Sequence, residues 1–394
     1  MRRRRLTLVV AGLALALVAT ACSSGGGGGN TSSAPAAAPG DPLDLKGVCP
    51  NPIVVQKDWQ PESEHGFLYN LLGDGYKVDT NKKKVQGPLI AHGKNTGVDI
   101  QIRTGGPAVG FQPVPAVMYQ DRSINLGYVA TDEAVQFSAK QPTMAVFAQM
   151  DISPLALMWD PKTYPQFHVL ADIGQANPAP TVLYTKGLSY MEYLVGSGII
   201  RRNQLDGSYD GSPGAFVAAN GKDVLQGFAT SEPYLYQHEI KQWGRPLKYA
   251  LVNDTGYPVY FSSMSIRTDD KAKLAPCLKK LVPILQQSQA DFIANPNRAI
   301  GIILELVQKY NTGWRYSKGL AEYSAKALKD IGIVSNGRDK TLGNFEMDRV
   351  AKVIGIVSPI MTGQKVVIKQ GLKPEDIATN DFIDPKIGLN TAAP

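Results

Sequence analysis

The sequence predicts an α/β protein of two facing blocks joined by a hinge and followed by a helical C-terminal region. Three observations support this fold class. Short apolar strands alternate with helical stretches from Cys49 onward, a pattern typical of α/β domains. The alternation resumes in a second block after a polar loop at 150–154. Beyond Lys271, apolar residues recur at helical spacing.

The composition suits a folded protein with two cores. Of 394 residues, 43% are hydrophobic and 19% are charged, which excludes a disordered chain and a mini-scaffold. Four of the +7 formal charges are Arg2 to Arg5, so the rest of the chain carries only +3. Because this excess is weak and dispersed, we expect no nucleic-acid partner.

The N-terminus has the pattern of an export signal. Arg2 to Arg5 precede an apolar stretch from Leu6 to Ala21, and Cys22 follows. This start resembles the lipobox of bacterial lipoproteins, whose Cys becomes the lipidated first residue, although Ala19 stands where Leu or Val is usual. The alternative is a secretory signal with an incidental Cys22. We expect a signal peptide at 1–21 and a lipid anchor that holds the chain at the outer face of the cytoplasmic membrane.

Residues 22–45 are expected to form the lipidated Cys and a flexible linker, because 23–40 contain only Ser, Gly, Asn, Thr, Ala and Pro. The two remaining cysteines leave two interpretations open. Cys49 and Cys277 either form a disulfide that ties the start of the folded body to a late helix, or stay buried thiols. Cys277 shares the apolar face of Leu274 and Leu278, which suits the second interpretation.

The elements of the first block follow from apolar patterning and turn residues. We predict strands at 53–55, 98–102, 125–130 and 143–149, a helix at 62–72 that Gly73 ends, and a helix that Thr131 caps. In the second block we predict strands at 182–184, 225–229 and 249–252, a helix that starts at Ser212-Pro213, and another from Ser231 to Gly244.

A strand at 259–265 is expected to cross back to the first block, and Pro283 should kink or break the first C-terminal helix. These elements place one lobe at 46–152 plus 255–394 and the other at 153–254.

Catalytic and metal-binding motifs are missing from the sequence. None of the four His has a partner at metal spacing, and Ser212 lacks a nucleophile elbow because Asp210 replaces its first glycine. Gly105-Gly106-Pro107 lacks the P-loop Lys and the dinucleotide fingerprint. We therefore expect no enzyme, cofactor or metal. Polar loops do follow the strands, and such loops bind ligands in the crevice of open α/β sheets, so we expect a solute trap that closes by hinge motion.

Three segments resemble a known family. Residues 58–66 (DWQPESEHG), 211–217 (GSPGAFV) and 229–234 (ATSEPY) are similar to loops of solute-binding proteins of the nitrate/sulfonate/taurine class, which includes binding proteins for pyrimidine precursors of thiamine. The resemblance spans about residues 50–385. It implies a type II periplasmic-binding-protein fold and a monomer that delivers a small-molecule solute to an ABC permease.

The resemblance also implies which positions meet ligand in an interlobe cleft. They are Asp58, Trp59, Glu62, His65, Gly105, Thr131, Asp132, Asp151, Asp210, Ser212, Ser231, Glu232 and Tyr234. Other roles compete at several of them. Trp59 could belong to the core, Asp132 and Glu232 could complement helix dipoles, Asp210 could form a turn, and Tyr234 could pack behind its loop.

The charges of these loops suggest the ligand class. Five are carboxylates (Asp58, Glu62, Asp132, Asp210 and Glu232), and only Arg103 and Lys186 are basic neighbours. Carboxylates repel a desolvated nitrate or sulfonate but accept hydrogen bonds from a nitrogen compound, so we expect an organic nitrogenous ligand that stacks on Trp59 or a Tyr. Three alternatives stay open: a binding protein for nitrate, sulfonate or taurine, a pyrimidine-synthesis-type enzyme, and a surface-displayed binding or adhesion protein without a transporter.

Overall fold

Two β-sheets organise the chain in this computed structural model, which describes residues 34–390. The first sheet has seven strands in the order β2 (Lys77–Asp79), β3 (Lys84–Ala91), β4 (Lys94–Arg103), β1 (Ile53–Gln56), β5 (Leu126–Val129), β12 (Ser263–Arg267) and β6 (Thr143–Phe147). The second has five in the order β11 (Lys248–Leu251), β7 (Leu155–Trp159), β10 (Val224–Phe228), β8 (Val182–Leu183) and β9 (Leu205–Asp206). We call the parts around these sheets lobe 1 and lobe 2.

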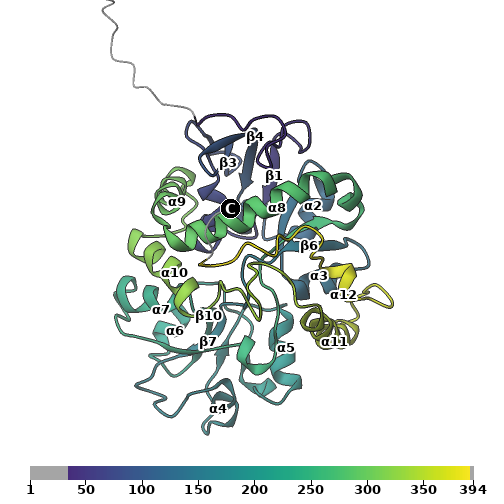
Figure 1. Cartoon of the computed structure of the whole chain (residues 1–394). Helices are drawn as coiled ribbons and strands as arrows, with labels where there is room; N and C mark the ends of the chain where they lie inside the picture. Colours follow the sequence, from purple (N-terminus) through teal and green to yellow (C-terminus); the bar gives the residue numbers. More distant parts are fainter. Residues whose placement is uncertain (1–33, 391–394) are drawn as a thin grey trace, which may run out of the picture. The chain divides into compact units, whose positions relative to one another are not determined.

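The chain passes between the sheets twice, from β6 to β7 and from β11 to β12 (Figure 1). The predicted lobe boundaries, at 152/153 and 254/255, lie in these two passages. The assignment of the C-terminal helices to lobe 1 stays a prediction. The predicted signal peptide, Cys22 and the linker before Ala34 lie outside the described residues. Within the described part, no helix is long and apolar enough to cross a membrane.

Strand direction brings the loops of interest to one edge of each sheet. β1 is parallel to β4 and β5, while β12 is antiparallel to β5 and β6. The carboxyl ends of β1, β4, β5 and β6 therefore share one edge with the start of β12. In lobe 2, β8 is parallel to β9 and β10, so their carboxyl ends also share an edge. Ligands of open α/β sheets bind outside such edges.

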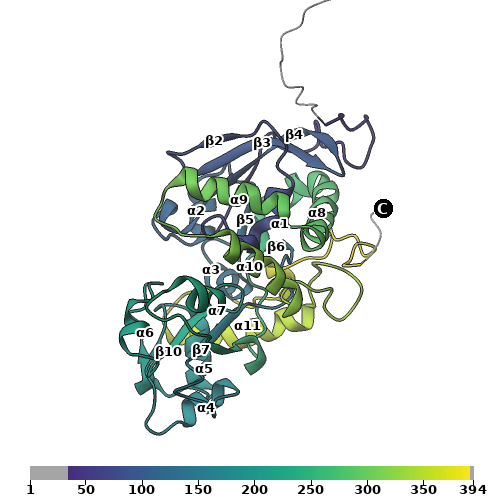
Figure 2. The same cartoon turned by 90° about the vertical axis from the view of Figure 1, so that its left-hand side faces the viewer.

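Twelve α-helices complete the described part of the chain. They are α1 (Gly66–Asn70), α2 (Val114–Gln120), α3 (Thr131–Phe137), α4 (Leu170–Gln175), α5 (Ser189–Gly196), α6 (Gly214–Ala218), α7 (Glu232–Tyr234), α8 (Lys271–Ala294), α9 (Asn297–Tyr310), α10 (Lys318–Asp330), α11 (Met347–Gly363) and α12 (Pro374–Ile377). Figure 2 shows α8 and α9 beside the strands of lobe 1 and α4, α5 and α6 in lobe 2. α11 contacts both α3 and α5, so it links the two lobes.

The central strand of lobe 1 is buried on both faces. Ile53 and Val55 pack in the core with α1, α8 and α9, whereas Val54 packs in the core of α2, α3 and α11. All three are at most 4% exposed. Helices on both faces explain why β1 is a continuous apolar run in the sequence.

Most predicted strands are present, but the structure also shows four that we did not predict: β2, β3, β7 and β9. The predicted strand at 259–265 begins only at Ser263. Before it, Tyr260 pairs by backbone and side-chain hydrogen bonds with Thr131 instead of extending the strand.

Three helix predictions are wrong in detail. The helix predicted at 62–72 is a 3-10 turn, η1 (Ser63–His65), followed by α1, which ends at Asn70, because the backbone of 71–73 pairs with 88–90 of β3. The helix predicted from Ser231 to Gly244 is α7 with a π-helical turn, η4 (Leu235–Glu239). Helix α8 runs without interruption through Pro283.

The predicted linker is shorter than 22–45. Ala37 N–H donates to the Asn95 carbonyl at 2.8 Å, and Leu45 N–H donates to the Thr96 carbonyl at 2.9 Å. Asp41 forms an ion pair with Lys94 at 2.8 Å. The chain from Ala34 is thus bound to the β3–β4 hairpin. A disulfide joins Cys49 to Cys277 of α8.

Candidate functional site

The loop that follows β1, from Lys57 to His65, packs closely against the loop that follows β4. We call this β1 loop the floor of the candidate site. Lys57 N–H donates to the Arg103 carbonyl at 2.9 Å, and Gly105 N–H donates to the Trp59 carbonyl at 3.1 Å. A Cβ atom at Gly105 would lie 2.2 Å from the Lys57 carbonyl oxygen. Gly105 therefore positions the floor by permitting this close approach of two backbones.

Asp58, Glu62 and His65 come together on this floor. His65 Nε2 lies 3.2 Å from Asp58 Oδ1, and His65 Nδ1 lies 3.6 Å from Glu62 Oε1. The Ser262 hydroxyl donates to the other Asp58 oxygen, Oδ2. The His65 ring stacks on Tyr128 of β5, with centroids 4.5 Å apart. Burial lowers the pKa of His65 well below its usual value, so the ring is neutral at physiological pH.

Lys57 is the basic residue of the site, and our sequence analysis missed it. Its ammonium group is fully buried and donates to the Gln60 carbonyl at 2.6 Å and to the Tyr69 hydroxyl at 3.1 Å. Burial lowers its pKa to about 8. Arg103, which we had expected nearby, instead pairs with Asp121 at 2.7 Å. The position of Lys57, directly after a buried strand and before Asp58, was the signal that could have revealed it.

Burial raises the pKa of five carboxyl groups around this floor. Desolvation is the largest cause for each of them, and we call them the acidic cluster: Asp58, Glu62, Glu64, Glu133 and Glu232. The pKa of Glu64 rises to about 7 and that of Glu133 to about 8. Sequence analysis predicted Asp58, Glu62 and Glu232 but missed Glu64 and Glu133.

The acidic cluster spans both lobes. Glu232, at the start of α7 in lobe 2, contributes to the raised pKa of Glu62 and of Glu64 in lobe 1. The Phe228 N–H donates to Glu232 Oε2 at 2.7 Å, and the Ser231 hydroxyl donates to the same oxygen at 2.6 Å. Ser231 therefore holds Glu232 in place.

The oxygens of these carboxyl groups can accept hydrogen bonds and, when ionised, can pair with positive charge. With a raised pKa, such a carboxyl group holds its proton up to a higher pH than usual, and a nearby positive charge favours its ionised form. Within residues 34–390, no group of three or more His, Cys, Asp or Glu side chains has the geometry of a metal site.

The prediction that Thr131 caps α3 is wrong, whereas Asp132 lies in the first turn of this helix, as predicted. Thr131 is the first helical residue and not its cap, and its hydroxyl accepts a hydrogen bond from the Tyr260 N–H at 3.1 Å. Asp132 Oδ2 accepts hydrogen bonds from Ser189 of α5 and from Tyr257, each at 2.8 Å. Asp132 therefore links lobe 1 to lobe 2.

Three other predicted residues have clear local partners. Asp151 pairs with Arg349 at 3.0 Å and accepts from the Ser335 hydroxyl at 2.7 Å. Asp210 is exposed and accepts from the Ser212 N–H at 2.9 Å. Ser212 is also exposed, and Pro213, not Ser212, is the N-cap of α6. The structure therefore does not bring these residues into the acidic cluster, and their contact with ligand stays a prediction.

Aromatic residues lie beside the floor. The Trp59 ring centroid is 6.1 Å from that of Phe111 and 6.0 Å from that of Trp314. Trp59 is partly exposed and Phe111 is 68% exposed, so an aromatic surface borders the site. Tyr234 packs against Tyr323 of α10, with centroids 5.5 Å apart, which agrees with a role behind its loop.

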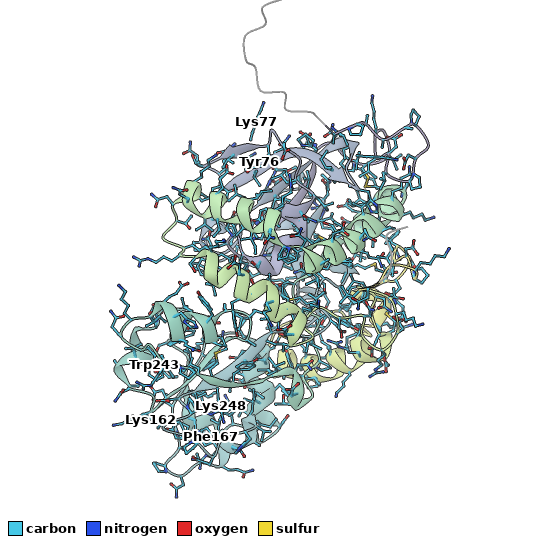
Figure 3. The ribbon with its side chains drawn as sticks, turned by 60° about the vertical axis from the view of Figure 1, so that its left-hand side comes forward. Tyr76, Lys77, Lys162, Phe167, Trp243 and Lys248 are labelled. Carbon is cyan, nitrogen blue, oxygen red and sulfur yellow. A yellow bond between two sulfur atoms is a disulfide. The ribbon has the colours of Figure 1, made fainter. Side chains whose placement is uncertain are left out.

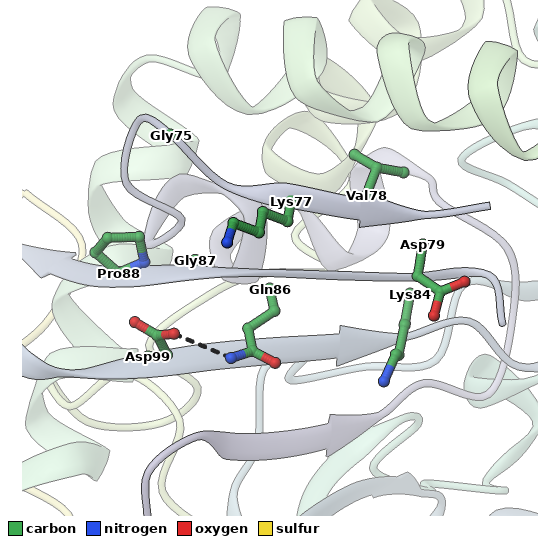
Figure 4. Close-up of a pocket in the computed structure, with 9 residues that line it drawn as sticks. All are labelled: Gly75, Lys77, Val78, Asp79, Lys84, Gln86, Gly87, Pro88 and Asp99. Carbon is green, nitrogen blue, oxygen red and sulfur yellow. Dashed lines mark hydrogen bonds between the residues drawn. The ribbon is translucent and has the colours of Figure 1, made fainter. Parts of the chain in front are cut away.

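One pocket of about 420 Å³ lies elsewhere, on the polar face of β2, β3 and β4 (Figure 4). None of the predicted ligand residues lines it, and its Gln86 amide already donates to Asp99 at 3.0 Å. Figure 3 labels Lys77 of this pocket at the end of lobe 1, away from the labelled Lys162 and Trp243 of lobe 2. We place the candidate site at the acidic cluster, where Glu232 of lobe 2 affects the pKa of Glu62 and Glu64 of lobe 1.

Comparisons with known proteins show the fold. No family model and no curated protein matches the chain. Among solved structures, the chain is similar to the alkanesulfonate-binding protein SsuA from Xanthomonas axonopodis pv. citri, solved with bound MOPS. The identity is 14% over 84% of this chain and 100% of that one, with a TM-score of 0.50.

Two further structures are less similar. The aliphatic sulphonate binding protein SsuA from Escherichia coli has 13% identity over 87% of this chain and 96% of its own, with a TM-score of 0.49. The desulfurization enzyme DSZB has 9% identity over 80% of this chain and 93% of its own, with a TM-score of 0.42. The fold of this chain is the two-lobed fold of periplasmic binding proteins, as the sequence predicted.

Proposed function

We propose that the chain is the extracytoplasmic substrate-binding lipoprotein of an ABC importer, and that it captures an organic, nitrogen-containing solute between its lobes and delivers it to a permease. Its fold supports the binding role. The predicted lipobox at Cys22 supports the anchor. The proposal includes no catalytic step.

The acidic cluster is the observation that carries the ligand class. Its five carboxyl groups come from both lobes. Within residues 34–390, Lys57 is the one basic side chain whose charge lowers the pKa of Asp58, Glu62 and Glu64. A desolvated anion such as nitrate would need compensating donors and positive charge. A nitrogen compound instead supplies donors to the carboxylates and can stack on the partly exposed Trp59.

The alternative ligand class is an anion, because the similar SsuA proteins are named for alkanesulfonates and aliphatic sulphonates. At 13–14% identity this likeness shows only the fold, and the acidic cluster opposes an anion. The other alternative is an enzyme, and turnover of a bound ligand is the result that would favour it.

A thermal-shift screen of the full chain tests the ligand class. The panel contains nitrate, taurine, alkylsulfonates, pyrimidines, other nitrogen heterocycles and alkylamines. A ligand at a hundred times its Kd stabilises the folded state by about 2.7 kcal/mol, which raises Tm by several degrees. We expect shifts with nitrogen compounds. A shift with sulfonates or nitrate alone would show that the ligand class is wrong.

The anchor needs its own test. Cells that express the full chain are labelled with a fatty acid, and the wild type is compared with Cys22→Ser. We expect label and membrane association only in the wild type, because Ser cannot form the thioether. Equal membrane association of both proteins would argue against lipidation.

A further inference from the structure

We infer that α10 is a latch between the two lobes. It fastens the lobe 2 loop that leads to Glu232 to the floor of lobe 1, and its bonds to lobe 2 must break before the lobes can separate. The inference rests on the proposed function only in that a two-lobed binding protein opens to admit its solute. It does not depend on which solute is bound.

The lobe 1 side of α10 is bonded to the floor. The Ser63 hydroxyl donates to the Ala321 carbonyl of α10 at 2.9 Å. The Ser63 N–H donates to the hydroxyl of Tyr316, just before the helix, also at 2.9 Å. Ser63 is fully buried. α10 also contacts α8 and α9, which pack against β1. It is therefore attached to lobe 1 through both the floor and these helices.

The lobe 2 side of α10 holds the loop between β10 and α7. The Ser324 hydroxyl donates to the Thr230 carbonyl at 2.6 Å, and the Tyr323 hydroxyl donates to the Ala229 carbonyl at 3.2 Å. Ser324 and Thr230 are fully buried, where an unpaired carbonyl would be costly. The loop that leads to Glu232 is thus fixed by α10, and α10 connects it to the floor.

A second attachment joins the start of α10 to α7 and the turn that follows. The hydroxyl of Ser317, the N-cap of α10, donates to the Glu239 carboxylate. A Cβ atom at Gly319 would lie 1.9 Å from the Tyr234 hydroxyl oxygen. Only a glycine therefore lets Tyr234 of α7 approach the helix this closely. Figures 1 and 2 show α10 between α9 and α7.

The lobe 2 attachment is the weaker of the two. The contacts of α10 with η1, α8 and α9 are more extensive than those with any helix or strand of lobe 2. Because α10 cannot stay bonded to both lobes when they separate, the bonds to Ala229 and Thr230 are the ones that break. The bonded state is the one seen in this structure, and the open state lacks these bonds.

Hydrogen exchange and small-angle X-ray scattering of the full chain, without any solute, test the latch. Gly319→Ala places a methyl group against the Tyr234 hydroxyl. The amides of 229–231 should then exchange about tenfold or more faster than in the wild type, the effect of losing one or two buried hydrogen bonds. The radius of gyration should rise as the lobes separate.

Two matched variants control for the added methyl group. Gly301→Ala lies in α9, where a Cβ meets nothing within 4 Å, and it should leave both measurements at their wild-type values. In the double variant Gly319→Ala, Tyr234→Phe, the hydroxyl that collides is gone. Exchange at 229–231 should then return to within about threefold of the wild type, and the radius of gyration should fall again.

Ser324→Ala keeps the test decisive if Gly319→Ala does not fold, because it removes only the donor to the Thr230 carbonyl. It should change both measurements in the same direction as Gly319→Ala. Wild-type values in both variants would overturn the inference. Faster exchange with an unchanged radius of gyration would overturn it too, because α10 would then support the loop without holding the lobes together. Since no solute is present, either result leaves the proposed function standing.

Discussion

At the residue scale, the acidic cluster makes the stability of the ligand-free protein fall as the pH rises. A carboxyl group whose pKa is raised by burial holds its proton in the folded state and loses it in the unfolded state. The stabilising contribution of such a group is therefore complete below the unfolded pKa, near 4.5 for Glu, and is lost as the pH rises through the folded pKa. For Glu64, the window runs from about pH 4.5 to about pH 7.

The first prediction is that Glu64→Gln removes the loss of stability that the wild type shows as the pH rises through the pKa of Glu64. Because Gln cannot ionise, the variant should gain stability over the wild type by about 1–3 kcal/mol between pH 5 and pH 8 in the absence of ligand. Thermal unfolding of both proteins at several pH values measures the difference. Glu322→Gln is the control on α10, and its difference from the wild type should stay constant. A constant difference for Glu64→Gln as well would mean that Glu64 is not desolvated.

The second prediction concerns Trp59. Its ring is partly exposed beside the floor and packs against Phe111 and Trp314. Trp59→Ala should weaken binding of the ligand found in the screen by about 1–3 kcal/mol, while Tm of the ligand-free protein should fall only slightly. Calorimetry and thermal unfolding separate the two effects. A fall in Tm that matches Trp243→Ala, a buried tryptophan of lobe 2, would make Trp59 a core residue instead.

Residues of the site were predictable where they directly follow a strand. Asp58 and Glu232 stand within a few positions of the ends of β1 and β10, and the shared edge of each sheet explains why such residues meet. Glu64 and Glu133 were missed because an acidic residue in a helical first turn usually only complements the helix dipole. Their burial depends on tertiary packing, which no local sequence pattern reveals.

At the element scale, hydrophobic runs were read more reliably than polar strands. β1, β5 and β10 are buried runs and were predicted. β3 alternates intermediate and buried positions and contains a Gly and a Pro, and we missed it. Pro283 was expected to kink or break α8. The helix is not broken there, because the buried face of this 24-residue helix offsets the cost of about 3 kcal/mol for an internal Pro.

The third prediction tests the contact between the loops after β1 and β4. In Gly105→Ala, the new methyl group would collide with the Lys57 carbonyl, so either the floor or the β4 loop must move. We expect a loss of about 1–3 kcal/mol in stability and a clear loss of ligand affinity. Gly301→Ala in α9 is the matched control, because its Cβ meets nothing within 4 Å, and it should stabilise the helix by up to about 1 kcal/mol. Unchanged ligand affinity in Gly105→Ala would show that the floor is not part of the site.

At the scale of the whole molecule, the two lobes are joined by more than the two passages of chain. Asp132 of α3 accepts from Ser189 of α5, and the Ser324 hydroxyl of α10 donates to the Thr230 carbonyl. The second bond ties the loop that leads to Glu232 to α10. The two-lobed class could be predicted from the alternation of elements, but these contacts could not, because they depend on how the lobes meet.

The last prediction concerns the disulfide between Cys49 and Cys277, which are 228 positions apart. Cross-linking such distant residues restricts the unfolded chain, so reduction, or the double variant Cys49→Ser, Cys277→Ser, should lower the free energy of unfolding by about 2–4 kcal/mol. Cys49 precedes β1, whereas the acidic cluster lies beyond the opposite end of this strand. Ligand affinity should therefore stay within about twofold of the wild type. Thermal unfolding with and without reductant and calorimetry of the variant measure both quantities. Equal Tm in oxidised and reduced protein would show that the pairing contributes nothing, and a large loss of affinity would show that the disulfide also shapes the interlobe site.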